Sequence, residues 1–272
     1  MKNLKKLFLE STFFRVFNII KKNPNTYLYT IVLDFIFLAS LIFMGKYFGS
    51  FIPQDPQQIM ALFKTQTNLL LFVFGYPLLY YLFVIFIYSI TKLSILNLIK
   101  PLHEKHKFSL KGFGKFYLLN ILIFIIFFFT ALILLGILAL ILREDFLKYV
   151  VLFLLIPFLF FFYSIINISH TLFIKNKKEK IIKKSFNIAF NKINHYGMFI
   201  VWNVILILIY LLIYNIIHLI FRFTIFTNQE ILTAYGSTYL KIFNIISIIF
   251  IYLIIAFNRI YFYERIDKNV LQ

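Results

Sequence analysis

The sequence contains no cysteine and few charged residues for its length. Without a thiol the chain cannot form a disulfide, a thiolate metal site or a cysteine nucleophile, and cysteine usage gives no information on its redox compartment. Charged residues make up 14% of the 272 residues and hydrophobic residues 62%, whereas soluble domains are about a quarter charged and half apolar. This balance excludes a soluble globular fold.

The sequence also lacks the short motifs of common catalytic chemistry. No phosphate-binding glycine loop, serine elbow or close carboxylate pair is present. The stretch HEKH at 103–106 places its two histidines three residues apart, whereas the zinc metalloprotease helix needs them four apart. We therefore assign no catalytic residue, no metal site and no cofactor.

Long apolar runs are what the sequence has in abundance. A helix rises about 1.5 Å per residue, so about 20 apolar residues cross a hydrocarbon layer of about 30 Å. We predict an all-α, polytopic helical bundle that forms a single integral membrane domain over residues 1–272, with its first span retained rather than cleaved as a signal peptide. The six predicted spans are residues 27–48, 67–91, 116–142, 148–174, 197–221 and 239–263.

The net charge of +18 is distributed unevenly between the segments that flank these spans. Alternate segments are rich and poor in Lys and Arg, so that one side carries 22 of the 28 basic residues. Because positive residues stay in the cytoplasm, we predict a cell-membrane protein with both termini cytoplasmic. Nucleic acid is not needed to explain the charge. The expected partners are the lipid bilayer, anionic headgroups at the cytoplasmic face, at about 1 kcal/mol per surface cation, and a protein of unknown identity.

The organisation indicates an internal repeat of a basic amphipathic segment, a span, an outer turn and a second span. Residues 17–34 and 186–203 are identical at seven of eighteen aligned positions, with Asp34 opposite Asn203. The alternative is a repeat of three units, whose middle unit matches more weakly and places Asn120 opposite Asp34. The basic segments before the first and fifth spans have helical patterning that suits a membrane surface. Their apolar faces are Phe13, Val16, Phe17 and Ile20, and Ile182, Phe186, Ala189, Phe190 and Ile193.

Asp34 is a lone carboxylate about seven residues, or about 10 Å, inside the first span. An ionised side chain at that depth costs at least about 2.5 kcal/mol, so it should face protein, find a partner or take up a proton. Arg259 lies at a similar depth in the last span, and we predict a mainly structural Asp34–Arg259 pair. A proton or substrate site, or a protonated Asp34 bonded to Asn or Tyr, are the alternatives.

Other spans carry polar side chains at nearly the same level as Asp34. With Asp34 and Arg259 they form a predicted intramembrane polar cluster, which is either structural or part of a transport path. Hydrogen bonds between helices explain such residues without a ligand, and a lined cavity is the alternative. The additional members are Asn120, Asn167, His170, Asn203 and Asn258.

The stretch KKNPNTYLYTIVLD at 21–34, together with the repeated arrangement of amphipathic segment and paired spans, resembles uncharacterised six-span prokaryotic membrane proteins. These are similar to the membrane domain found beside some glycerophosphodiester phosphodiesterases. The resemblance rests on architecture and implies no functional residue, and the phosphodiesterase domain has no counterpart in this sequence.

Three functional classes remain from the sequence. The first is a non-enzymatic membrane component that binds lipid or protein partners at its basic cytoplasmic face. The second is a transporter or permease with a polar intramembrane site around Asp34. The third is a membrane-embedded enzyme acting on lipid, for which the sequence offers only scattered His and acidic side chains.

Overall fold

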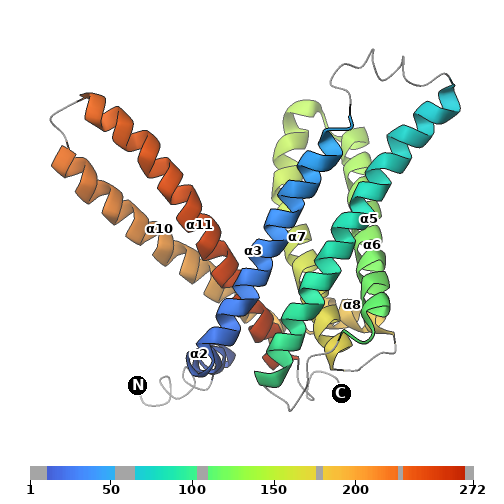
Figure 1. Cartoon of the computed structure of the whole chain (residues 1–272), viewed down its shortest axis with the longest axis horizontal. Coiled ribbons are helices and arrows are strands. Elements are labelled where there is room, and N and C mark those ends of the chain that lie inside the picture. The colour runs from blue at the N-terminus through green and yellow to red at the C-terminus, as the bar shows by residue number, and fades with distance from the viewer. Residues whose placement is uncertain (1–10, 53–64, 103–109, 176–179, 226–228, 267–272) are drawn as a thin grey trace. The chain divides into compact units, whose positions relative to one another are not determined.

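The structure, a computed structural model, describes residues 11–52, 65–102, 110–175, 180–225 and 229–266, and within these ranges every regular element is a helix. The predicted all-α bundle is therefore confirmed. In chain order the elements are α2 (Thr12–Lys22), α3 (Pro24–Gly49), α5 (Gln66–Ile99), the 3₁₀ helix η1 (Lys100–Leu102), α6 (Phe113–Ile141), α7 (Glu144–Ile174), α8 (Ile181–Asn191), α9 (Ile193–Tyr196), α10 (Met198–Ile225) and α11 (Gln229–Arg265) (Figure 1).

Six of the described helices are long and apolar enough to cross a membrane, which confirms the number of spans and makes this an integral membrane protein. Five of them agree with the predicted runs to within a few residues. The second differs, because its helical stretch reaches residue 102 rather than 91. Residues that hydropathy assigned to a connection therefore continue the helix. The six candidate spans are Pro24–Gly49, Thr67–Leu102, Phe113–Ile141, Tyr149–Ile174, Met198–Ile220 and Thr238–Arg265.

Local sequence signals explain where these helices begin. The backbone N–H of Asn68 donates to the Thr65 hydroxyl at 3.3 Å and caps α5. Gly112 precedes α6 with φ of +92°, a left-handed conformation that favours glycine. Pro24 opens α3 directly after Asn23, where its missing N–H costs nothing because the first turn has no acceptor for it.

The helices form two compact units, the central unit (Leu28–Ala189) and the terminal unit (Met1–Tyr27 with Phe190–Gln272). In the central unit the tightly packed residues lie where α5 ends, α6 begins and α7 ends. Ile95, Ile123 and Ile168 are fully buried there, while Leu140 and Phe153, towards the other end of α6 and α7, are largely exposed. The core thus sits at one end of the central unit, and apolar side chains at the other end are available to lipid.

In the terminal unit α10 and α11 run antiparallel. Tyr210 stacks on Phe250 with ring centroids 4.3 Å apart, and its hydroxyl lies 2.8 Å from the Ser247 hydroxyl. Nearer the other end of the pair, Phe199 contacts Phe262 at 4.9 Å between centroids. These contacts set the register in which residues near 203 and 258 lie at the same level.

The helix α2 packs against α10 and α11 of the same unit. Phe13 stacks on Trp202 with ring centroids 4.1 Å apart. Arg15 forms an ion pair with Glu264 at 3.8 Å, and the Arg265 guanidinium donates to the Thr12 hydroxyl at 3.4 Å. The last turn of α11 and the first turn of α2 are therefore joined by polar contacts as well as by aromatic packing.

The two helices that patterning predicted are present as α2 and α8, and each buries only part of its apolar face in the protein. In α2, Val16 is buried whereas Phe17 is 53% exposed. In α8 the buried face includes Ile181, Ser185 and Ile188, and Phe190 is 52% exposed. In α8 the buried face also holds the Ser185 hydroxyl, which accepts from Ser169. The internal repeat and the single membrane domain stay predictions.

Candidate functional site

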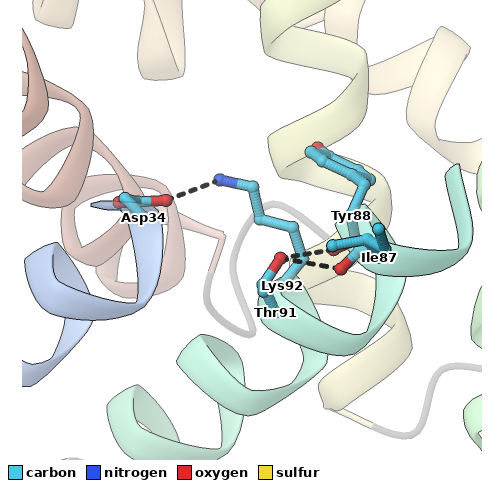
Figure 2. A network of polar contacts seen from close by, with 5 residues as sticks. All are labelled: Asp34, Ile87, Tyr88, Thr91 and Lys92. Carbon is cyan, nitrogen blue, oxygen red and sulfur yellow. Dashed lines mark hydrogen bonds and ion pairs between the residues drawn. The ribbon is translucent and has the colours of Figure 1, made fainter. Parts of the chain in front are cut away.

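The carboxylate of Asp34 on α3 faces the ammonium group of Lys92 on α5, within the central unit (Figure 2). The Lys92 Nζ to Asp34 Oδ1 distance is 3.5 Å, and the two side chains are 13% and 3% exposed, respectively. Charge-assisted hydrogen bonds are usually about 2.7–2.9 Å long, so this is an ion pair with a long contact. Lys92 was missed from the sequence because it was counted with the connection after the second span.

The helix around Lys92 is arranged so that its polar groups have local partners (Figure 2). The Thr91 hydroxyl lies 3.0 Å from both the Ile87 and the Tyr88 carbonyl oxygens one turn earlier. The Lys92 ammonium lies 5.4 Å from the centre of the Tyr88 ring, within the range of a cation–π contact. The Tyr88 ring and the Asp34 carboxylate therefore both attract the ammonium group electrostatically.

A second set of polar side chains forms a hydrogen-bond chain across α5, α6 and α7. The Asn120 amide Nδ2 donates to Ser89 Oγ at 2.8 Å, and His170 Nε2 lies 2.7 Å from Asn120 Oδ1. The Ser89 hydroxyl donates to the Ile85 carbonyl at 2.7 Å. Since its one proton is committed there, Ser89 must accept from Asn120, and Asn120 must present its oxygen to His170. His170 therefore carries a proton on Nε2.

The two sets meet at Tyr88, whose ring centroid is 6.0 Å from that of His170. We call Asp34, Ser89, Lys92, Asn120 and His170 the polar layer. Apart from Lys92, each of these residues is at most 3% exposed. The layer draws side chains from α3, α5, α6 and α7, so it ties four helices of the central unit together.

Further polar contacts connect α8 and η1 to α7. The Ser169 hydroxyl donates to Ser185 Oγ at 2.8 Å, and Ser185 donates to the Ile181 carbonyl. The Lys100 ammonium, on η1, donates to the Ile174 carbonyl at the end of α7 at 3.4 Å. A cation at this position satisfies one of the open carbonyls of a helix C-terminus.

Of the residues predicted to form the intramembrane cluster, the structure brings Asn120 and His170 into direct contact. Asn167 lies one turn before His170, and its amide donates to the Tyr163 carbonyl of the same helix at 2.8 Å. Asp34 contacts Lys92, which the prediction did not include. The functional role assigned to the cluster stays a prediction.

The other three predicted members, Asn203, Asn258 and Arg259, belong to the terminal unit. Asn258 and Arg259 are buried on α11, and Asn203 is half-buried on α10. Among the described residues, the amide oxygens of Asn203 and Asn258 have no hydrogen-bond partner. The Asp34–Arg259 pair stays a prediction, because its two members lie in different units.

The polar layer is a hydrogen-bond network beside one ion pair. The Asn120 amide donates to the Ser89 oxygen, the Ser89 hydroxyl donates to a backbone carbonyl, and the Asp34 carboxylate faces a lysine. In the described part of the chain no three His, Asp or Glu side chains gather as metal ligands do. The HEKH stretch at 103–106 lies outside the described residues.

Comparisons of the chain with protein-family models, with curated proteins and with solved structures find no match.

Proposed function

We propose that this protein is a multi-pass component of the cell membrane with both termini in the cytoplasm, that it catalyses no reaction, and that its basic cytoplasmic face binds anionic lipid headgroups. The observation that carries this proposal is the placement of 22 of the 28 Lys and Arg residues in alternate segments around six spans. A protein partner at the same face is the related alternative. We include in this proposal the resemblance to six-span prokaryotic membrane proteins, for which the support is the shared architecture.

The hydrogen bonds of the polar layer support a structural role for its uncharged members Ser89 and Asn120. Side chains that move a substrate or a proton need changing partners, whereas Ser89 and Asn120 are held by bonds whose directions are set by a backbone carbonyl. In a membrane, helix association depends on packing and hydrogen bonds between helices, because lipid is as apolar as the helix surface. The layer supplies such bonds where the central unit is most tightly packed.

The proposal is tested by the lipids that the protein retains. Full-length protein in nanodiscs with equal phosphatidylglycerol and phosphatidylcholine is extracted in mild detergent, and the bound lipids are quantified by mass spectrometry. We expect phosphatidylglycerol to be enriched several-fold, and the enrichment to fall at 1 M salt, where charges are screened beyond about 3 Å. A retained mixture equal to that of the bilayer would refute the proposal.

A transporter with a site around Asp34 is the second candidate, favoured by the buried Asp34–Lys92 ion pair. Intramembrane charges of this kind often mark proton or ion pathways. Its test is proton flux into liposomes that contain the wild-type protein or Asp34→Asn. Flux above that of empty liposomes, lost in the folded variant, would favour the transporter, and equal flux in both proteins would dismiss a proton role for Asp34.

A further inference from the structure

The central unit has an open groove lined by α6, α7, α8 and the residue that precedes α8. Its volume is about 500 Å³, within the range of about 300–1,000 Å³ typical of small-molecule sites. Buried Leu119, Phe173 and Ile181 form its floor. The groove lies at the tightly packed end of the unit, where α6 begins and α7 ends, and it contains no residue of the polar layer.

Of the described residues that line this groove, three are lysines and none is acidic. Lys115 comes from the first turn of α6, Lys180 directly precedes α8, and Lys183 lies in the first turn of α8. All three are exposed. Residues from two distant parts of the sequence therefore bring three positive charges to one apolar concavity, which favours an anionic group there.

The groove changes from charged to apolar along α6. Lys115, Leu118, Leu119 and Leu122 follow one another at helical spacing on the face that lines it. Lys115 and Leu122 are separated by about 10 Å along the helix axis. Leu118 and Leu122 are 59% and 50% exposed, so their apolar surface is uncovered next to the cations.

We propose that this groove binds one phospholipid with an anionic headgroup, whose phosphate contacts the three lysines and whose acyl chain lies over Leu118 and Leu122. The inference rests on the proposed function, in that it locates the anionic lipid that the basic face attracts. A zwitterionic lipid would bring its own cation to the lysines, and a second copy of this chain would bring a net charge of +18. A free phosphate would leave the apolar wall uncovered. An anionic phospholipid matches both parts of the groove.

The test is native mass spectrometry of the full chain in detergent, titrated with dioleoylphosphatidylglycerol or dioleoylphosphatidylcholine. The groove variant combines Lys115→Gln, Lys180→Gln and Lys183→Gln. The control variant combines Lys21→Gln, Lys22→Gln and Lys192→Gln, which remove the same charge from the same predicted side but do not line the groove. Circular dichroism and gel filtration confirm that both variants fold.

We expect the groove variant to bind the first phosphatidylglycerol roughly tenfold or more weakly, because three surface cations each contribute to anionic lipid binding. The control should stay within roughly twofold of the wild type, since none of its three lysines lines the groove. If the wild type prefers phosphatidylglycerol and the groove variant binds it as tightly as the wild type does, the lipid does not bind in this groove and the proposed function stands. If the wild type has no preference, the proposed function fails as well.

A second variant tests the apolar part of the groove while keeping every charge. Leu118→Trp with Leu122→Trp fills the space beside the lysines, and we expect it to lose phosphatidylglycerol binding to a similar degree. Inorganic phosphate serves as the headgroup-only probe and should compete weakly with the lipid. If phosphate competes fully and the tryptophan variant binds lipid normally, the groove is a free-anion site. Dimerisation that the tryptophan variant abolishes would assign the groove to a second copy. Either result would overturn the lipid assignment.

Discussion

Asp34 lies inside an apolar helix, and the ammonium group of Lys92 on α5 lies 3.5 Å from its carboxyl oxygen. A buried ion pair of this kind adds little net stability compared with a well-packed apolar pair, but removing one partner strands the other. The cost of losing the partner differs between the two residues. An unpaired lysine can extend its long stem towards the headgroups, whereas the short aspartate side chain cannot.

We predict that Lys92→Gln destabilises the protein by about 3 kcal/mol and that Asp34→Asn costs less. The double variant should cost less than the sum of the two single variants, with a coupling energy of about 1–3 kcal/mol. Reversible unfolding in mixed micelles measures all three. Additive effects would mean that the two side chains do not interact.

The same approach separates the two candidate partners of Asp34. A cycle between Asp34→Asn and Arg259→Gln measures whether the arginine of the last span also interacts with the carboxylate. Strong coupling to Arg259 would confirm the pair predicted from sequence. Coupling to Lys92 alone would mean that Asp34 interacts with Lys92 and not with Arg259.

Asn120 is the centre of the second polar set, because both ends of its amide are used. Asn120→Leu removes both bonds and leaves the buried Nε2–H of His170 without its acceptor, so we predict a loss of about 2–3 kcal/mol in the free energy of unfolding. The matched control is Asn215→Leu on α10, an exposed residue whose amide donates to the Leu211 carbonyl of its own helix. A loss at Asn120 no larger than at Asn215 would contradict a stabilising role for the network.

Sequence reasoning identified Asp34, Asn120 and His170 as buried polar residues because each interrupts a long apolar run. It did not find Lys92. Hydropathy marks where apolar character fades, and a lysine at that edge reads as a connection, yet α5 continues to Ile99. The partner of a buried charge depends on which helices are neighbours, and this information is not contained in one helix's pattern.

At the scale of elements, α2 shows how a short basic helix is held by the terminal unit. Its Phe13 stacks on Trp202, the one tryptophan of the chain. Patterning predicted this helix, because helical periodicity is a local property. The buried face was less predictable, since it depends on what α10 and α11 present to the helix.

The single tryptophan makes the docking of α2 measurable. We predict that Phe13→Ala shifts the Trp202 emission to longer wavelength, because the indole loses a stacked ring 4.1 Å away, and that it lowers stability by about 1–2 kcal/mol. Phe17→Ala is the control, since Phe17 is 53% exposed on the same helix. An unchanged spectrum in the Phe13 variant would show that α2 is not docked on α10.

At the scale of the whole molecule, the six spans were predictable because a run of about 20 apolar residues has few other uses in a chain of this length. The division into a central and a terminal unit was not. Two apolar helices look alike by hydropathy, and which of them pack together depends on small complementary contacts such as Ser169 with Ser185 and Tyr210 with Ser247.

The sidedness of the basic segments also belongs to this scale, and the absence of native cysteine makes it directly measurable. Single cysteines at Lys22, Lys111 and Lys192 mark the basic side, and cysteines at Ser50 and Arg143 mark the other. Each variant is treated in intact cells with a membrane-impermeant maleimide, and again after the cells are opened. We predict that Ser50→Cys and Arg143→Cys react in intact cells and that the three lysine positions react only in opened cells. Reaction of the lysine positions from both sides would contradict the account.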